Sequence, residues 1–276
     1  MPQTRMTRIS LYALLILLAV LFSFPLYWMI VNSLQPLLTG VTWFPLRPTL
    51  SNYHLAFTLQ PFWMYFKNSC ILALISVGIP IITSFFSAFA FARLRAKFKG
   101  FLFMVILATM MVPATVTQIP QYVLFHQYGL LGTYWPWILG GLGGSPFIIF
   151  LYRQFFMNVP RELDEAARID GCSTYGIIFR IYMPISLPVI ATAGILLFNA
   201  SWGGDYLAPY MFLQERQYPL ATQLMQVGYI MPNAPSVSLF QVQEAALVIF
   251  ILPILIVFMV GQRYLISGIM TGAVKS

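Results

Sequence analysis

Residues 158–184 read NVPRELDEAARIDGCSTYGIIFRIYMP, a charged stretch in a chain that is otherwise strongly apolar. Within it, Glu165-Ala166-Ala167 is followed after three residues by Gly171, and after nine more by Ile181-Tyr182-Met183-Pro184. The segments on both sides have the composition of membrane spans, which need roughly 20 apolar residues each. This stretch must therefore connect the membrane part of the protein to something in water.

The composition excludes a water-soluble protein. Hydrophobic residues make up 59% of the 276 residues, charged residues only 8%, and the mean hydropathy is +0.80. A soluble domain has about 25% charged residues, so this chain lacks the polar side chains needed to cover a soluble surface.

We predict an all-α polytopic membrane protein that forms one transmembrane domain over residues 1–276. The six predicted spans cover residues 11–33, 69–92, 101–122, 131–152, 186–209 and 241–264. The charged loop 153–185 then lies between the fourth and fifth spans. The first span is expected to remain uncleaved, because its apolar run is longer than that of a signal peptide.

Basic residues predict the orientation of the spans. Of the 15 Lys and Arg residues, 12 lie on one side, namely Arg5, Arg8, Arg93, Arg95, Lys97, Lys99, Arg153, Arg161, Arg168, Arg180, Arg263 and Lys275. The other three are Arg47, Lys67 and Arg216. The positive-inside rule places the larger group, both termini and the charged loop in the cytoplasm. The net charge of +8 therefore reflects membrane topology and does not indicate nucleic-acid binding.

Two long outer loops, residues 34–68 and 210–240, contain several prolines. Composition alone leaves two interpretations equally open. The loops either lie against the bilayer surface or a partner protein, or they serve only as connectors.

The charged loop has the pattern of two short helices joined by a turn. Pro160 suits a first helical turn, and Leu163, Ala166 and Ala167 share one face of the helix that follows. Gly171 can end that helix. Ser173 or Thr174 can cap a second one, which Pro184 is expected to end.

The charged side chains of the first helix allow two interpretations. Arg161, Asp164, Glu165 and Arg168 have the i+3 and i+4 spacing at which opposite charges pair along one helix. Alternatively, they form a charged rim around a face of small residues, which would suit insertion into a cleft on another protein. An alanine face offers little area for packing on the chain's own helices.

With this loop, the chain resembles the integral-membrane permeases of bacterial ABC importers. Their signature is Glu-Ala-Ala, three residues, Gly, nine residues, then Ile-x-Leu-Pro, and this chain has Met183 in place of the leucine. Further stretches are similar to carbohydrate-importer permeases of the maltose-system type: Asn52-Tyr53, Lys67-Asn68-Ser69, Met111-Val112-Pro113, Gln127-Tyr128-Gly129-Leu130, 161–171 and the tail 267–275. The resemblance covers nearly the whole chain.

The resemblance implies a non-catalytic subunit of a sugar importer in the bacterial cytoplasmic (inner) membrane. It implies four partners: a second permease, two cytoplasmic ATPase subunits and an extracytoplasmic binding protein. The loop would dock on an ATPase through Glu165, Ala166, Ala167, Asp170, Gly171, Ile181 and Pro184. The sequence has no G-x-x-x-x-G-K-[ST], so we expect ATP and Mg²⁺ to bind the partner and no cofactor or metal to bind this chain.

Polar residues near the fifth and sixth spans are candidates for the solute pathway. They are Asn199, Trp202, Asp205 and Glu244. A carboxylate inside a bilayer is costly and usually faces a cavity or a partner. The family commonly has Trp-Asn and an acidic residue where this chain has Trp202-Gly203-Gly204-Asp205. Trp202 is alternatively an anchor at the membrane interface.

Other classes of membrane protein compete with this interpretation. An ion-coupled secondary transporter needs ionisable groups within the membrane, for which only Asp205 and Glu244 are candidates. A membrane enzyme needs a group of catalytic residues. His54 and His126 are far apart in the sequence, and neither has the spacing to other residues that a metal site requires. An ABC importer permease for a solute other than sugar also remains open.

Overall fold

The computed structural model describes residues 5–40 and 42–273, so Lys275 of the predicted cytoplasmic basic group lies outside the described residues. The chain divides into two compact units. Unit 1 combines residues 1–63 with 227–252, and unit 2 combines residues 64–226 with 253–276.

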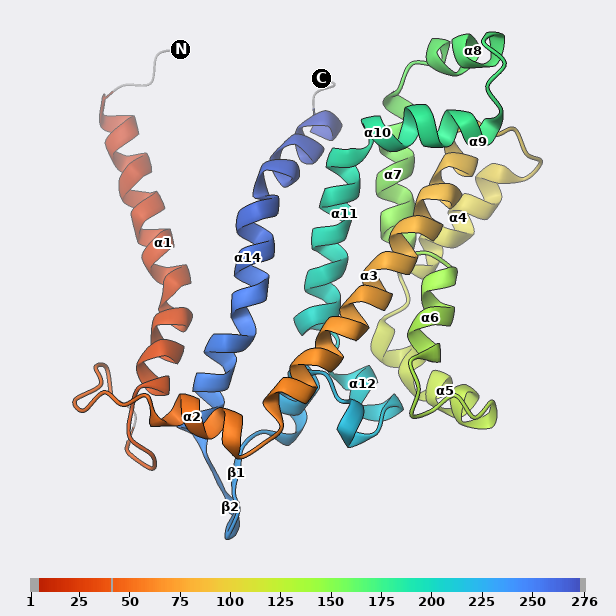
Figure 1. Cartoon of the computed structure of the whole chain (residues 1–276). Helices are drawn as coiled ribbons and strands as arrows, with labels where there is room; N and C mark the ends of the chain where they lie inside the picture. Colours follow the sequence, from red (N-terminus) through yellow and green to blue (C-terminus); the bar gives the residue numbers. More distant parts are fainter. Residues whose placement is uncertain (1–4, 41, 274–276) are drawn as a thin grey trace. The chain divides into compact units, whose positions relative to one another are not determined.

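Long apolar helices dominate both units (Figure 1), which confirms the prediction of an all-α polytopic membrane protein. Five helical segments are long and apolar enough to span a membrane: 8–33, 62–93, 135–158, 187–204 and 240–264. They correspond to the predicted first, second, fourth, fifth and sixth spans. The helices that carry them are longer than predicted at several ends, such as α1 (Arg5–Ser33), α3 (Phe62–Arg93) and α14 (Phe240–Ala273).

The predicted third span, residues 101–122, is not one straight helix. It consists of α4 (Lys99–Thr109) and α5 (Ala114–Gln127), which are bent by 95° relative to each other. Pro113 lies at the break with extended backbone angles (φ −60°, ψ 133°). Proline cannot donate a backbone hydrogen bond and disfavours helical angles in the residue before it, so the helix is interrupted here.

The fourth and fifth spans are also interrupted. The fourth consists of α6 (Trp135–Leu142) and α7 (Pro146–Asn158). The fifth was predicted as 186–209, but α11 (Leu187–Asn199) continues only through the π-helical turn η2 (Ala200–Gly204). A separate helix, α12 (Leu207–Phe212), follows. Gly203 and Gly204 favour this break because glycine stabilises a helix poorly.

Unit 1 contains α1, the short helix α2 (Ser51–Thr58), a small antiparallel hairpin and the first part of α14. The hairpin pairs β1 (Ile230–Met231) with β2 (Ala234–Ser238) in the register Ile230↔Ser238 and Met231↔Ala234, with an irregularity between the two pairs.

Buried polar side chains tie the two long outer loops together within unit 1. The Asn52 amide donates to the carbonyls of Ser33 (2.8 Å) and Gln35 (2.6 Å). The Tyr229 hydroxyl donates to the carbonyl of Ala56 (2.7 Å), and the Gln60 amide donates to that of Gly228 (2.7 Å). A buried polar group is stable only when it is hydrogen-bonded. The loops are therefore parts of a folded unit rather than simple connectors.

Unit 2 is built around α3 and an aromatic core at the end of that helix nearer Arg93. Phe85 and Phe89 of α3 pack edge-on against Phe156 of α7, with ring centroids 5.0 and 6.3 Å apart. Tyr182 packs against both Phe89 (5.0 Å) and Phe156 (5.3 Å). Edge-to-face aromatic pairs of this kind stabilise beyond the area that they bury. Outside the core lie the remaining short outer elements, the 3₁₀ turn η3 (Glu215–Gln217), α13 (Leu220–Thr222) and the π-helical turn η4 (Gln223–Val227).

The basic residues of unit 2 lie at opposite ends of α3, as the charge count predicts. The Asn68 amide near the start of α3 donates to the carbonyl of Arg216 (2.9 Å), which places Lys67 and Arg216 at that end. Arg93 is the last residue of the same 32-residue helix. At about 1.5 Å per residue, a helix of this length exceeds the thickness of a bilayer core, so it is long enough for the predicted topology.

Glycines in the fourth span allow close contact with α3. A Cβ at Gly141 would lie 3.1 Å from Ile79, and one at Gly144 would lie 3.1 Å from both Ile149 and the Ser84 hydroxyl. Nothing lies within 4 Å of a Cβ at Gly140. The contact face is therefore formed by Gly141 and Gly144.

We predict that Gly144→Ala destabilises the protein. Gly144 has a φ of +74°, which is unfavourable for other residues, and its Cβ would crowd Ser84. Together these effects should lower the free energy of unfolding by about 1–3 kcal/mol. Thermal unfolding in detergent would measure the change, with Gly140→Ala as the matched control that should cause little loss. Equal stability of the two variants would contradict the proposed contact.

Candidate functional site

The charged loop of unit 2 contains the short helix α8 (Glu162–Ile169) and, after a turn, a second helical run. That run consists of α9 (Thr174–Ile177), the π-helical turn η1 (Ile178–Tyr182) and α10 (Met183–Ile185). We call residues 158–185 the coupling loop. Figure 1 shows α8 and α9 beside the ends of α7 and α3, all within unit 2.

Gly171 forms the turn between the two helical parts. Its φ of +77° is the left-handed conformation that ends many helices. The N–H of Cys172 donates to the carbonyl of Ala167 (2.9 Å), and that of Gly171 donates to Arg168 (3.0 Å), which is the complete Schellman pattern. Ser173 then caps α9 by accepting a hydrogen bond from the Gly176 N–H (3.2 Å).

Pro184 does not end the second helical part, contrary to our expectation. It occupies the first turn of α10, where a missing N–H costs no intrahelical bond. The chain is helical from Thr174 to Ile185 and resumes at Leu187 as the fifth span. The coupling loop is therefore joined to α11 by nearly continuous helix.

The two alanines of the motif face different surroundings. Ala167 is buried in the aromatic core of unit 2, whereas Ala166 is exposed. The expectation that both belong to one outward face is wrong, because Ala167, about 100° from Ala166 around the helix, is turned toward the core. Ala167 allows α8 to approach its own protein closely, and only Ala166 remains available to a partner.

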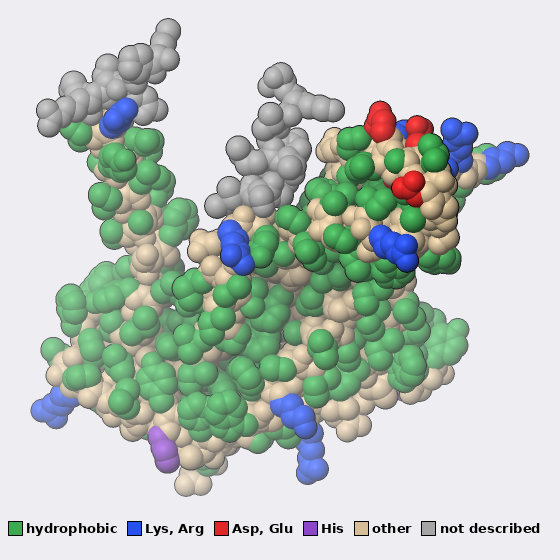
Figure 2. Space-filling model, turned by 45° about the horizontal axis from the view of Figure 1, so that its top comes forward, with side chains coloured by type: hydrophobic (Ala, Val, Ile, Leu, Met, Phe, Trp, Pro, Cys, Tyr) green, Lys and Arg blue, Asp and Glu red, His purple; other side chains and the backbone are tan. Residues whose placement is uncertain are grey.

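Large apolar side chains are exposed on the coupling loop in addition to Ala166. Ile169 is 87% exposed, and Tyr175 is 71% exposed. Leu163 and Phe179 are exposed as well. Figure 2 shows acidic and basic side chains gathered beside hydrophobic ones at this end of unit 2. An apolar patch bordered by charges is typical of a protein–protein contact.

The remaining residues of the motif lie on both sides of the loop. Glu165, Asp170 and Gly171 are exposed, and Asp170 follows the last residue of α8. Ile181 is half-buried against the aromatic core. Glu165 is therefore free to reach a partner, whereas Ile181 fixes the loop to unit 2.

Asp164 does not pair within its helix. Its Oδ2 atom lies 3.6 Å from the Nε atom of Arg93 of α3. The Tyr182 hydroxyl donates to the other carboxylate oxygen of Asp164 (2.8 Å). Sequence reasoning missed Arg93 and Tyr182, since nothing local distinguishes Arg93 from the other basic residues of the larger predicted group.

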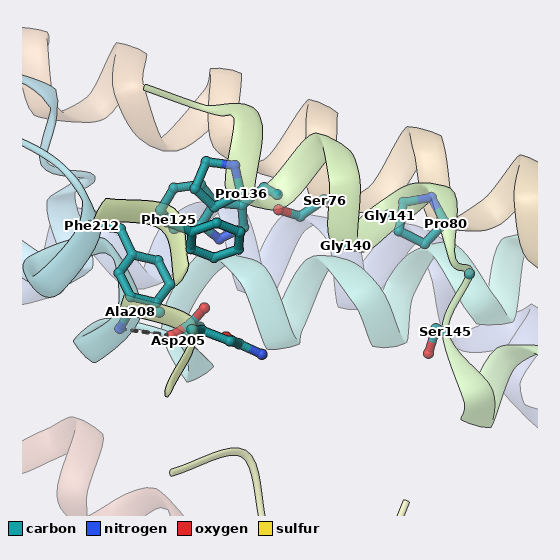
Figure 3. Close-up of a pocket in the computed structure, with 13 residues that line it drawn as sticks. Ser76, Pro80, Phe125, Pro136, Gly140, Gly141, Ser145, Asp205, Ala208 and Phe212 are labelled. Atoms are coloured by element: carbon teal, nitrogen blue, oxygen red, sulfur yellow. Dashed lines mark hydrogen bonds between the residues drawn. The ribbon is translucent and has the colours of Figure 1, made fainter. Parts of the chain in front are cut away.

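A second candidate site is a cavity of about 350 Å³ in unit 2, lined by apolar and several polar residues. We call it the Asp205 cavity. Figure 3 shows Ser76, Ser145 and Asp205 among the residues that line it. Gln121 and Trp137 also line the cavity. Asp205 accepts hydrogen bonds from the Ala208 N–H (3.2 Å) and from the Trp137 side chain.

A smaller cavity of about 200 Å³ shares Ser76, Trp137 and Asp205 with the first and adds Ser201. The hydroxyls of Ser76 and Ser201 are buried and have no hydrogen-bond partner among the described residues. Buried hydroxyls without partners are uncommon in proteins, so these two are available to a polar guest.

Of the predicted pathway residues, only Asp205 lines the Asp205 cavity. Trp202 is buried between Phe198 (centroids 5.2 Å apart) and Phe66 (5.6 Å), so it is a packing residue rather than an interfacial anchor. Asn199 is exposed at the end of α11. Trp137, which sequence reasoning did not single out, supplies the aromatic face beside Asp205.

Glu244 belongs to unit 1 and lies half-buried in α14. The neighbouring Gln241 amide donates to the carbonyl of Thr39 (3.1 Å) and holds the start of α14 to the first outer loop. The structure assigns Glu244 to a separate unit from Asp205, so its role in a solute pathway stays a prediction.

The family "Binding-protein-dependent transport system inner membrane component" matches residues 80–271, which include the coupling loop, Asp205 and most of α14. The chain belongs to this family. The predicted assignment to the ABC transporter permeases is thereby confirmed.

Three curated relatives of this permease are similar over most of its length. The sulfoquinovosyl glycerol transport system permease protein of Agrobacterium fabrum is 32% identical, with 91% of this chain and 88% of the relative covered. An arabinooligosaccharides transport system permease protein of Halalkalibacterium halodurans is 32% identical, with 91% of each covered. The lactose transport system permease protein of Rhizobium radiobacter is 31% identical, with 98% and 97% covered.

A solved structure shares the fold of the permease. It is a crystal structure of a bacterial ABC transporter involved in the import of the acidic polysaccharide alginate. The match has a TM-score of 0.80 and 23% identity, and it covers 95% of this chain and 98% of the other.

We predict that Ala167→Leu and Ala166→Leu have different effects on the permease. Leucine at the buried position 167 must overpack the aromatic core and should lower the free energy of unfolding by about 1–3 kcal/mol. Leucine at the exposed position 166 should change it by less than about 0.5 kcal/mol. Unfolding of both variants in detergent measures the difference, and similar losses would show that both alanines are packed inside.

Proposed function

We propose that this permease forms one half of the translocation path of an ATP-driven importer for carbohydrate solutes. The names of three relatives refer to the transport of sulfoquinovosyl glycerol, arabinooligosaccharides and lactose. These solutes share hydroxylated rings. Carboxylate, amide and hydroxyl groups beside an aromatic face suit such rings, and the Asp205 cavity contains all four kinds of group.

The observation that carries the proposal is the exposed apolar surface of the coupling loop. Apolar side chains such as Ile169 and Tyr175 are exposed beside the charged residue Glu165. We infer that this surface docks in a groove of a cytoplasmic ATPase, of which the importer has two copies. ATP and Mg²⁺ bind to the ATPase subunits, and the permease converts their closure into alternating access.

A second permease and a binding protein complete the proposed importer. The apolar helix α1 is exposed along most of its length, and a second permease would cover part of this surface. The hydrogen-bonded outer loops of unit 1 offer a folded surface to an extracytoplasmic binding protein. In this arrangement the importer lies in the bacterial cytoplasmic membrane, with both termini of this chain in the cytoplasm.

We further propose that the solute passes through the Asp205 cavity on its way across the membrane. Asp205 already accepts two hydrogen bonds from the protein, which fix its orientation. The unpartnered hydroxyls of Ser76 and Ser201 lie beside it. Such groups bind the hydroxyls of a sugar in place of water, while Trp137 offers a face for its ring.

The competing function is secondary transport driven by an ion gradient, and uptake measurements separate the two. Titrations of the cognate binding protein with lactose, arabinotriose and sulfoquinovosyl glycerol first select the tightest-binding solute as the probe. We expect proteoliposomes with the complete importer to accumulate this probe with ATP and without an ion gradient. Uptake that needs a proton or sodium gradient and ignores ATP would overturn the proposed function, and failure to bind any of the three would contradict the carbohydrate assignment.

Two substitutions in the coupling loop should abolish this uptake while the protein still reaches the membrane. Glu165→Lys reverses the exposed charge beside the apolar surface. Gly171→Pro is incompatible with the φ of +77° that the turn requires. We expect both to lose ATPase association or coupling, measured by co-purification and by uptake. Glu162→Lys, a charge reversal in the same helix, serves as the control. Full association and uptake in both loop variants would refute the docking role.

Asp205→Asn should lower the rate of probe uptake by about tenfold, because a sugar hydroxyl binds a carboxylate more strongly than an amide. The amide oxygen can still accept the hydrogen bond from Ala208, so folding should be preserved. Glu215→Gln, which alters an exposed acid on the outer turn η3, is the matched control. Unchanged uptake in Asp205→Asn would exclude Asp205 from the pathway.

A further inference from the structure

Arg93 and Asp164 form a buried charge pair where the coupling loop meets the membrane part of unit 2. Arg93 is the last residue of α3, and its side chain is only 5% exposed. Asp164 lies in α8 with its side chain 14% exposed. The remaining charged residues of α8 are exposed, so Asp164 is the one that turns toward the protein.

Tyr182 joins this pair on a third element, η1. Its hydroxyl donates to Asp164 (2.8 Å), and its ring lies under the guanidinium of Arg93 with 5.3 Å between Cζ and the ring centroid. Burial and the hydrogen bond to Asp164 raise the pKa of the Tyr182 hydroxyl, so it remains a donor at neutral pH. Arg93 also donates to the carbonyl of Val159 at the end of α7.

These contacts connect the end of α3 with three segments of the later stretch 159–182. We call Arg93, Asp164 and Tyr182 together the clasp. Within the clasp, the charges of Arg93 and Asp164 stabilise each other, because an unpaired buried charge is strongly unfavourable. Separation of α8 from α3 would leave both charges without compensation. The clasp therefore favours movement of the two helices as one body.

The same helix α3 also forms part of the wall of the Asp205 cavity. Ser76 and Pro80 line the cavity, and Ser76 lies 17 residues before Arg93, about 25 Å along the helix. Pro80 cannot donate the usual helical hydrogen bond to the carbonyl of Ser76. The backbone of α3 therefore bends most easily beside the cavity, so that a displacement of its Arg93 end changes the helix at the cavity wall.

We propose that the clasp makes α3 follow α8, so that motion of the coupling loop reaches the wall of the Asp205 cavity through α3. This inference rests on the proposed function of the coupling loop. Arg93, Asp164 and Tyr182 are positioning residues that act through α3 and touch neither ATP nor solute. The connections of the loop to α7 and α11 are covalent, whereas the connection to α3 depends on side chains alone.

A purely structural role and a coupling role make different predictions for the double variant Arg93→Gln/Asp164→Asn. Single removal of either charge leaves the other buried and unpaired, so Arg93→Gln and Asp164→Asn should each lower the yield of the assembled importer. The double variant has no unpaired charge and should recover assembly. If the clasp serves only stability, the double variant should recover transport as well.

The experiment measures probe uptake and ATP hydrolysis in the same proteoliposomes, with the complete importer and the probe selected above. We expect the double variant to assemble and hydrolyse ATP but to transport at least about fivefold less probe per ATP, a loss typical of broken coupling between sites. Tyr182→Phe, which keeps the ring in the core and removes only the hydroxyl, should show a smaller loss in the same direction. Glu162→Gln, an exposed acid of the same helix, should retain the wild-type ratio.

The outcomes separate this inference from the proposed function. A wild-type importer that ignores ATP would overturn the proposed function itself. A wild-type importer that uses ATP, together with a double variant of unchanged probe-to-ATP ratio, would overturn only the clasp. A double variant that assembles and hydrolyses ATP with a lowered ratio would support both.

Discussion

The absence of water inside a bilayer is the constraint on which the arrangement of this chain depends. Backbone groups in that environment must find partners within the protein. The fourth span is broken near Ser145, and the chain meets this need with side chains of α3. The Ser84 hydroxyl accepts from the Ser145 N–H (2.9 Å), and the Thr83 hydroxyl donates to the carbonyl of Gly141 (2.7 Å). The break is thus possible only because α3 lies against it.

The same constraint explains where polar side chains gather in unit 2. Asp205 follows the break of the fifth span and accepts from the N–H of Ala208 in the first turn of α12. The Asp205 carboxylate therefore stabilises the start of α12 and at the same time lines the Asp205 cavity. At the other end of α3, Arg93 forms an ion pair with Asp164 of the coupling loop. Both sites therefore use α3 as a common support.

Much of the fold was predictable because its signals are local. Spans appear as apolar runs along the chain, and the distribution of Lys and Arg predicts which side of the membrane each loop faces. Gly171 was recognisable as a turn from its place after a periodic helix. The bends were harder to predict, since prolines inside spans are tolerated at Pro25, Pro80 and Pro253 but accompany a break at Pro113. Whether a proline interrupts a span depends on whether neighbouring groups can replace the backbone hydrogen bond that the proline cannot form.

The sequence by itself determined that this is a multi-span permease with a charged loop between its fourth and fifth spans. These properties depend on composition, spacing and charge along the chain. Only the tertiary structure decided that Ala167 faces the core, that Trp137 and not Trp202 borders the cavity, and that Asp164 pairs with Arg93. Each of these depends on contacts between segments that are distant in sequence. Helical periodicity shows which residues share a face, but only packing determines what that face meets.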